Sequence, residues 1–131
     1  GAGTNFHPFV NGELAAIGCT FMYMDKGIDT GDIIHQLRAE VDACDSIHQV
    51  GNRLIKRMTE EFINLVKGFD KVTEMPPLTD EVGKTYKMKD CTLDSLKQAY
   101  HNIESGVCVR YLKDQDVSDS RFPLIRQEFL C

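Results

Sequence analysis

The chain has 131 residues, the length of one ordinary domain. Hydrophobic residues make up 42% of it, enough for a core, but no apolar run approaches the roughly 20 residues of a membrane span, which excludes membrane insertion. The net charge of −5 disfavours nonspecific nucleic-acid binding, which depends on Lys and Arg. The first five residues show no secretion signal, so we expect a cytoplasmic protein.

The cysteines are five in number and scattered, which argues against a disulfide framework. We interpret them as reduced thiols. The sequence has no Cys-x-x-Cys motif, and the best Cys/His pair, Cys44 with His48, has no evident further ligands. We therefore expect no metal site.

The first third of the chain predicts two strands around a tight loop. Residues 1–12 end in Asn-Gly and indicate a loop with a short helix. Residues 17–24 form an apolar run that favours a buried strand. Residues 25–32 are dense in turn formers, and residues 33–41 alternate apolar and polar as a strand with one polar face does.

A long helix is predicted over residues 46–67. Ser46 and Gln49 match a capping box at its start, and Gly68 ends the pattern. Between them, apolar residues recur at helical spacing at Ile47, Val50, Leu54, Met58, Phe62 and Leu65.

The second half of the chain carries weaker patterns. Residues 70–84 contain Pro76-Pro77 and indicate a linker or crossing loop. A second helix is predicted over residues 93–103 after Thr92, then a short strand over residues 107–112 and an irregular end.

Three connected stretches resemble a known family. They are Gly-Ala-Gly-Thr-Asn-Phe at residues 1–6, Asn-Gly-Glu at residues 11–13, and Gly-Cys-Thr-Phe-Met-Tyr-Met-Asp-Lys-Gly-Ile-Asp-Thr-Gly-Asp-Ile-Ile at residues 18–34. Together they are similar to formyltransferases that use 10-formyltetrahydrofolate, which include enzymes acting on methionyl-tRNA, glycinamide ribonucleotide and nucleotide-linked amino sugars. The resemblance extends loosely through the helix at 46–67 and is weak afterwards.

This resemblance implies an α/β fold class: a partial formyltransferase fold in which a few strands pack with one long helix. We expect residues 1–69 to be the C-terminal portion of the catalytic domain. Residues 70–131 would then be a linker and a small appended α+β region.

The implied reaction begins when an amine attacks the formyl carbon, and it ends when the folate nitrogen leaves a tetrahedral oxyanion. The family uses an Asn, a His and an Asp, and the Asp falls on Asp29, where a carboxylate can hold the His charged and manage the amine proton. The same resemblance implies that the loop contacts the pterin of the folate, through Met24, Asp25, Lys26, Gly27, Ile28 and Gly31.

Two alternatives for the loop arise from its residues alone. A loop rich in Asp and Gly between strands is commonly a plain turn, in which Asp29 or Asp32 caps backbone amides. Calcium binding by Asp25, Asp29 and Asp32 does not fit, because their spacing is not that of a calcium loop.

His7 imitates a catalytic residue of the family. Asn5-Phe6-His7-Pro8 copies the start of the family's Asn-x-His-Pro-Ser-Leu-Leu-Pro, but the continuation differs and His7 lies only 22 positions before Asp29. The better alignment starts this chain after that motif, so we expect a truncated form without the catalytic Asn and His. His7 is then a surface or half-buried residue, and the other histidines are ordinary polar positions.

We therefore expect part of a formyltransferase that moves a formyl group from 10-formyltetrahydrofolate to an amine on a small-molecule substrate, and that is inactive alone. A nucleotide-linked amino sugar is favoured as acceptor over methionyl-tRNA, because residues 83–131 carry 8 Lys and Arg against 7 Asp and Glu, with no basic surface for tRNA. The alternative is a noncatalytic folate- or partner-binding module. Strand edges left open by a missing segment predict a homodimer.

Overall fold

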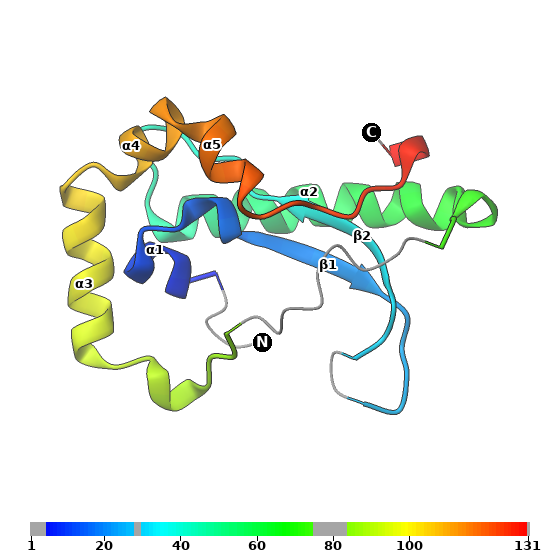
Figure 1. Ribbon diagram of the computed structural model, residues 1–131, viewed down its shortest axis with the longest axis horizontal. Coiled ribbons are helices and arrows are strands. Elements are labelled where there is room, and N and C mark those ends of the chain that lie inside the picture. The colour runs from blue at the N-terminus through cyan, green and yellow to red at the C-terminus, as the bar shows by residue number, and fades with distance from the viewer. Residues whose placement is uncertain (1–4, 28–29, 75–83, 131) are drawn as a thin grey trace.

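The computed structural model describes residues 5–27, 30–74 and 84–130. Its centre is a β-hairpin with a long helix, α2 (Ile47–Lys67), running beside it. Strand β1 (Gly18–Met22) pairs antiparallel with β2 (Ile33–Arg38), and these two strands are the whole sheet within the described residues (Figure 1). This mixed arrangement confirms the predicted α/β class, and it is consistent with a partial formyltransferase fold.

The hairpin register runs from Gly18 opposite Arg38 to Met22 opposite Ile33, with one irregularity next to Phe21. Gly18 is required by close approach, because a Cβ there would lie 2.3 Å from the carbonyl oxygen of Leu37. The strands therefore pair where the sequence predicted them.

The far edge of β2 is occupied by the C-terminal segment. The amide of Gln36 donates to the carbonyl of Ile125 at 2.8 Å, and the amide of Ile125 returns a hydrogen bond to the Gln36 side chain at 2.9 Å. Figure 1 shows this segment running beside β2. Among the residues that the structure describes, the outer edge of β1 is therefore the edge of the sheet that stays unpaired.

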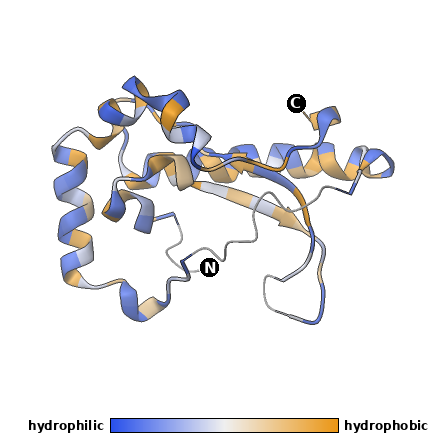
Figure 2. Cartoon of the chain, in the orientation of Figure 1, coloured by the Kyte–Doolittle hydropathy of each residue, from blue (hydrophilic) through white to orange (hydrophobic). Residues whose placement is uncertain are grey.

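Helix α2 begins as its sequence requires. The Ser46 hydroxyl accepts the amide of Gln49 at 3.3 Å, and the Gln49 side chain accepts the amide of Ser46 at 2.8 Å, which completes a capping box. Figure 2 shows apolar and polar residues alternating along the helix. The apolar face of α2 is only partly covered by the rest of the protein. Phe62 on this face stacks on Phe21 but is still 53% exposed.

The short N-terminal helix α1 (His7–Asn11) ends at Gly12, whose φ of 72° is the left-handed conformation that glycine tolerates. The 3-10 turn η1 (Leu14–Ala16) leads from it into β1. After α2, a second 3-10 turn, η2 (Phe69–Lys71), follows the helix directly.

The second half is more helical than its sequence predicted. Helix α3 (Leu93–Glu104) starts at the Thr92 cap as expected, after η3 (Met88–Asp90). The strand predicted over residues 107–112 is wrong: this segment is helix α4 (Val107–Lys113), because Val107, Cys108 and Tyr111 all turn into the core at helical spacing.

The predicted irregular end is also wrong, since α5 (Gln115–Ser120) and η4 (Glu128–Leu130) are formed there. None of the helices in the described ranges is long and apolar enough to cross a membrane.

One hydrophobic core joins the two halves of the chain. Arg38 reinforces it, because its guanidinium donates to the carbonyls of Ala15 and Phe122 and pairs with the Asp119 carboxylate at 3.1 Å. The division at 69/70 stays a prediction. The core residues are Phe9, Leu14, Ala15, Ile17, Leu37, Ala39, Val41, Val50, Leu54, Ala99, Val107, Cys108 and Tyr111.

Candidate functional site in the hairpin loop

The loop between the two strands is closed at its base by a backbone hydrogen bond. The amide of Tyr23 donates to the carbonyl of Asp32 at 3.0 Å, just beyond the last ladder pair. The loop extends away from the rest of the fold (Figure 1). Met24 is 99% exposed, and residues 25–27 and Thr30 are exposed as well, so this part of the loop is accessible to a ligand.

Asp25 organises the described part of the loop. Its carboxylate accepts the amide of Gly27 at 2.9 Å and the hydroxyl of Thr30 at 2.7 and 2.8 Å. This is an Asx-type turn tied to a residue five positions later, and it brings the two sides of the loop together. Asp25 therefore has a structural role, whatever the loop binds.

The two glycines of the loop are needed for close packing. A Cβ on Gly31 would lie 1.7 Å from the carbonyl oxygen of Tyr23, which the strand pairing holds in place. A Cβ on Gly27 would lie 1.9 Å from the Thr30 hydroxyl, which its bonds to Asp25 hold in turn. Substitution at either position would push the two sides of the loop apart.

A small hollow opens beside the loop base. It has a volume of about 220 Å³ and lies between the loop base and the chain that follows α2; it is lined by Tyr23, Asp32, Ile33, Ile34, Val72, Thr73 and Glu74. Its lining combines apolar residues, from β2 and at Val72, with the acidic residues Asp32 and Glu74. This mixture suits a small flat ring that has an apolar face and polar edges.

The predicted site residues divide into two groups. Met24, Asp25, Lys26, Gly27 and Gly31 all lie in the loop, as predicted, although none of them lines the hollow. Ile28 and Asp29 lie outside the described residues, so the predicted position of Asp29 stays a prediction.

Sequence reasoning missed the residues that line the hollow. Tyr23 and Asp32 could have been found, because they flank the loop motif directly. Thr73 and Glu74 gave no signal, since they reach the loop only because α2 returns the chain to this end of the hairpin.

His7 lies at the other end of the hairpin. It begins α1, which Figure 1 shows on the far side of β1 from the loop. It is only 3% exposed, so the expectation of a surface or half-buried residue is wrong. Its ring stacks on Tyr86, with 3.8 Å between the ring centroids.

His35 is also more than an ordinary polar position. It is 1% exposed, its Nδ1 accepts the amide of Gln127 at 3.0 Å, and its Nε2 lies 3.7 Å from the Glu61 carboxylate. Burial lowers the pKa of His35, and Glu61 opposes this only in part. Because Nδ1 accepts a hydrogen bond, it carries no proton, and the ring is neutral. The ring thereby holds the C-terminal segment on β2.

A larger hollow of about 570 Å³ lies between η1, α4 and α5, far from the loop. Its buried phenol, Tyr111, donates to the Asp119 carboxylate at 2.8 Å, and burial raises the pKa of Tyr111 to about 12. The Tyr111 hydroxyl and the Asp119 carboxylate therefore satisfy each other's hydrogen bonding. The greater volume of this hollow does not by itself favour it as a reaction site. In the described ranges, no group of three or more His, Cys, Asp or Glu side chains could hold a metal ion.

Comparison with known proteins gives a match that spans the loop region. Residues 2–66 match the family model described as formyl transferase. The match supports a member of the formyl transferase family. No solved structure matches the chain significantly.

The formyl transferase match covers α1, the hairpin with its whole loop, and α2 almost to its last residue. It therefore includes each residue predicted from the loop motif. It ends just before the capping residue Gly68 and before the Val72 to Glu74 side of the hollow.

Proposed function

We propose that this chain is part of an enzyme that transfers a formyl group from 10-formyltetrahydrofolate to an amine. The observation that carries the proposal is the family match over residues 2–66, which contains an exposed, closed loop with Asp-Thr-Gly at residues 29–31. The loop and the hollow at its base supply the two parts that such a site needs. One is accessible backbone, and the other is an apolar wall with polar ends.

The folate would lie against the loop. Within the described residues, the backbone amides of Met24 and Lys26 have no hydrogen-bond partner, so they are available to the polar edge of a pterin. Ile33 and Val72 would cover its face, and the donor would supply the formyl group. Asp29 would accept or hold the proton of the attacking amine, as the family resemblance implies.

The acceptor that we favour is a nucleotide-linked amino sugar. The loop sequence Tyr-Met-Asp-Lys-Gly-Ile-Asp-Thr-Gly-Asp-Ile-Ile looks closest to those enzymes, and residues 83–131 are nearly neutral. The chain carries no Asn-x-His-Pro-Ser-Leu-Leu-Pro motif, and positioned acid and base groups typically contribute factors of about 10² to 10⁴. We therefore propose that these 131 residues alone transfer no formyl group.

A formyl-transfer assay tests this directly. The purified chain, incubated with 10-formyltetrahydrofolate and an amino-sugar nucleotide, should give only background product. Turnover that falls when His7 is changed to Ala would show that His7 is the catalytic histidine, and it would overturn the proposal that the chain lacks one.

The second candidate is a noncatalytic module that uses the loop to bind folate or a protein. The observation in its favour is the exposure of the loop, whose accessible residues could bind folate or a protein without any further catalytic group. The coding sequence upstream of Gly1 separates the two candidates. An in-frame Asn-x-His-Pro-Ser-Leu-Leu-Pro supports the enzyme, and a coding sequence that lacks it supports the module.

A further inference from the structure

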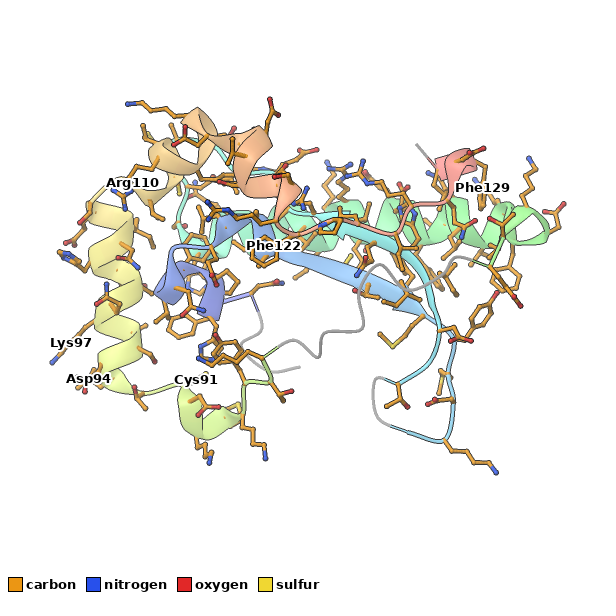
Figure 3. All side chains as sticks on the ribbon, viewed as in Figure 1. Cys91, Asp94, Lys97, Arg110, Phe122 and Phe129 are labelled. Atoms are coloured by element: carbon orange, nitrogen blue, oxygen red, sulfur yellow. The ribbon has the colours of Figure 1, made fainter. Side chains whose placement is uncertain are left out.

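A cysteine and a histidine meet at the end of the hairpin that lies away from the loop proposed for formyl transfer. The Sγ of Cys91 lies 3.8 Å from Nε2 of His7, which is within reach of a hydrogen bond from the larger sulfur atom. Cys91 is exposed, whereas His7 is 3% exposed. Figure 3 shows Cys91 between η3 and the start of α3.

The histidine ring is fixed by its neighbours. Tyr86 stacks on one face of the His7 ring with an interplanar angle of 13°. Phe6 meets the ring in an edge-to-face arrangement, with 5.4 Å between the ring centroids. Tyr86 is itself held, because its hydroxyl accepts the side-chain amide of Asn11 at 2.7 Å and the ammonium of Lys84 lies 4.9 Å from its ring. The ring therefore keeps Nε2 aimed at the thiol.

The backbone on both sides of Cys91 is fixed as well. Its own amide donates to the carbonyl of Met88 at 3.1 Å. The next residue, Thr92, shares a capping box with Ser95, and the Ser95 hydroxyl also reaches the carbonyl of Asp90 at 3.3 Å. A thiol that is exposed but held beside a buried base has the arrangement of an activated nucleophile.

We propose that Cys91 is a reactive thiol which His7 assists, and that it is modified by small-molecule disulfides. As the Cys91 sulfur attacks one sulfur of the disulfide, Nε2 of His7 accepts the thiol proton. A new S–S bond forms to Cys91 while the old S–S bond breaks. The Cys91 sulfur is oxidised, and the departing sulfur is reduced and receives the proton as a free thiol. This proposal is independent of formyl transfer.

Three of the other four cysteines provide internal controls. Cys44 is exposed, and it has no histidine contact within the described part of the chain. Burial raises the pKa of the Cys108 thiol, and burial likewise raises that of the half-buried Cys19, so both should react slowly. Cys44 is thus the matched comparison for Cys91.

The experiment uses dithionitrobenzoate, with the site of each mixed disulfide followed by peptide mass spectrometry. At neutral pH, Cys91 should react about tenfold faster than Cys44, because a positioned base adds to an exposed thiol's reactivity. The ratio should approach one in urea-unfolded protein. The neutral disulfide dithiodipyridine should also react faster with Cys91 than with Cys44. This result would exclude attraction of the negatively charged dithionitrobenzoate by nearby lysines as the cause of the difference.

His7→Phe keeps a ring against Tyr86 but removes the nitrogen, and it should bring Cys91 to within about twofold of Cys44. His48→Phe, on the exposed face of α2, is the matched control and should leave the ratio unchanged. A Cys91 to Cys44 rate ratio near one in the folded wild-type protein overturns the proposal. This result decides the matter even if His7→Phe does not fold. A high ratio that persists in folded His7→Phe overturns the role of His7.

Discussion

Asp45 should contribute far more to stability than its neighbour Asp42, although both carboxylates pair with Arg53. Asp45 is 4% exposed, and its carboxylate accepts the amide of Asp42 at 2.6 Å and both terminal nitrogens of Arg53 at 2.8 and 3.0 Å. The Asp42 carboxylate is 78% exposed and makes one contact to the same guanidinium at 2.9 Å. The two positions therefore differ in burial and in the number of hydrogen bonds that each carboxylate accepts.

The expected magnitude follows from these contacts. A hydrogen bond to a charged group contributes about 1.5 to 3 kcal/mol, and Asp45→Asn keeps one acceptor oxygen but turns an NH₂ toward a donor. Arg53 is 31% exposed and retains other partners, which reduces the cost. We expect a loss of about 2 kcal/mol in the free energy of unfolding for Asp45→Asn and under about 0.5 kcal/mol for Asp42→Asn.

The effect should also depend on pH. The hydrogen bonds from Arg53 hold the pKa of Asp45 below its usual value of 3.8, so the folded protein keeps the charge that the unfolded chain loses first. This stabilisation is full above the unfolded pKa and disappears as the pH falls through the folded pKa. Urea unfolding at neutral pH and in acid measures both variants. Equal losses for Asp45→Asn and Asp42→Asn at neutral pH would show that the buried carboxylate contributes no more than the exposed one.

Gly51, His35 and the open edge of β1 each give a further test of the fold. Gly51→Ala should stabilise the protein by about 0.5 to 1 kcal/mol in thermal unfolding, because a Cβ there meets nothing within 4 Å and alanine favours the helix; a loss would contradict this. Burial lowers the pKa of His35, so stability should fall as the pH drops below the unfolded value of about 6.5, and His35→Gln should flatten that slope in urea titrations. The open edge of β1 should pair with a second copy, and a monomer in light scattering at high micromolar concentration would count against this.

Local patterns were sufficient where local interactions determine the structure. Helix α2 was predicted correctly because Ser46 and Gln49 cap each other three residues apart, and the hairpin because its alternation and turn residues are contiguous. The segment after Gly106 was not, since its β-branched residues favour a strand until Val107 and Tyr111 are packed together on one helical face.

The contacts of His7 and His35 show the same limit of prediction from local sequence. Tyr86 lies 79 positions from His7 and Gln127 lies 92 from His35, and no short pattern announces either contact. The loop was found because its motif is contiguous, whereas the hollow beside it depends on the distant Thr73 and Glu74.

We propose above all that the hairpin loop binds the formyl-folate donor. Calorimetric titration of the chain with a chemically stable dideaza analogue of 10-formyltetrahydrofolate measures this binding. Wild type and Gly51→Ala should bind alike, whereas Gly31→Ala should bind at least about tenfold more weakly, because its Cβ would lie 1.7 Å from the carbonyl oxygen of Tyr23 and force the loop apart. Absence of binding to the wild type, or equal affinity for all three proteins, would show that the loop does not bind the donor.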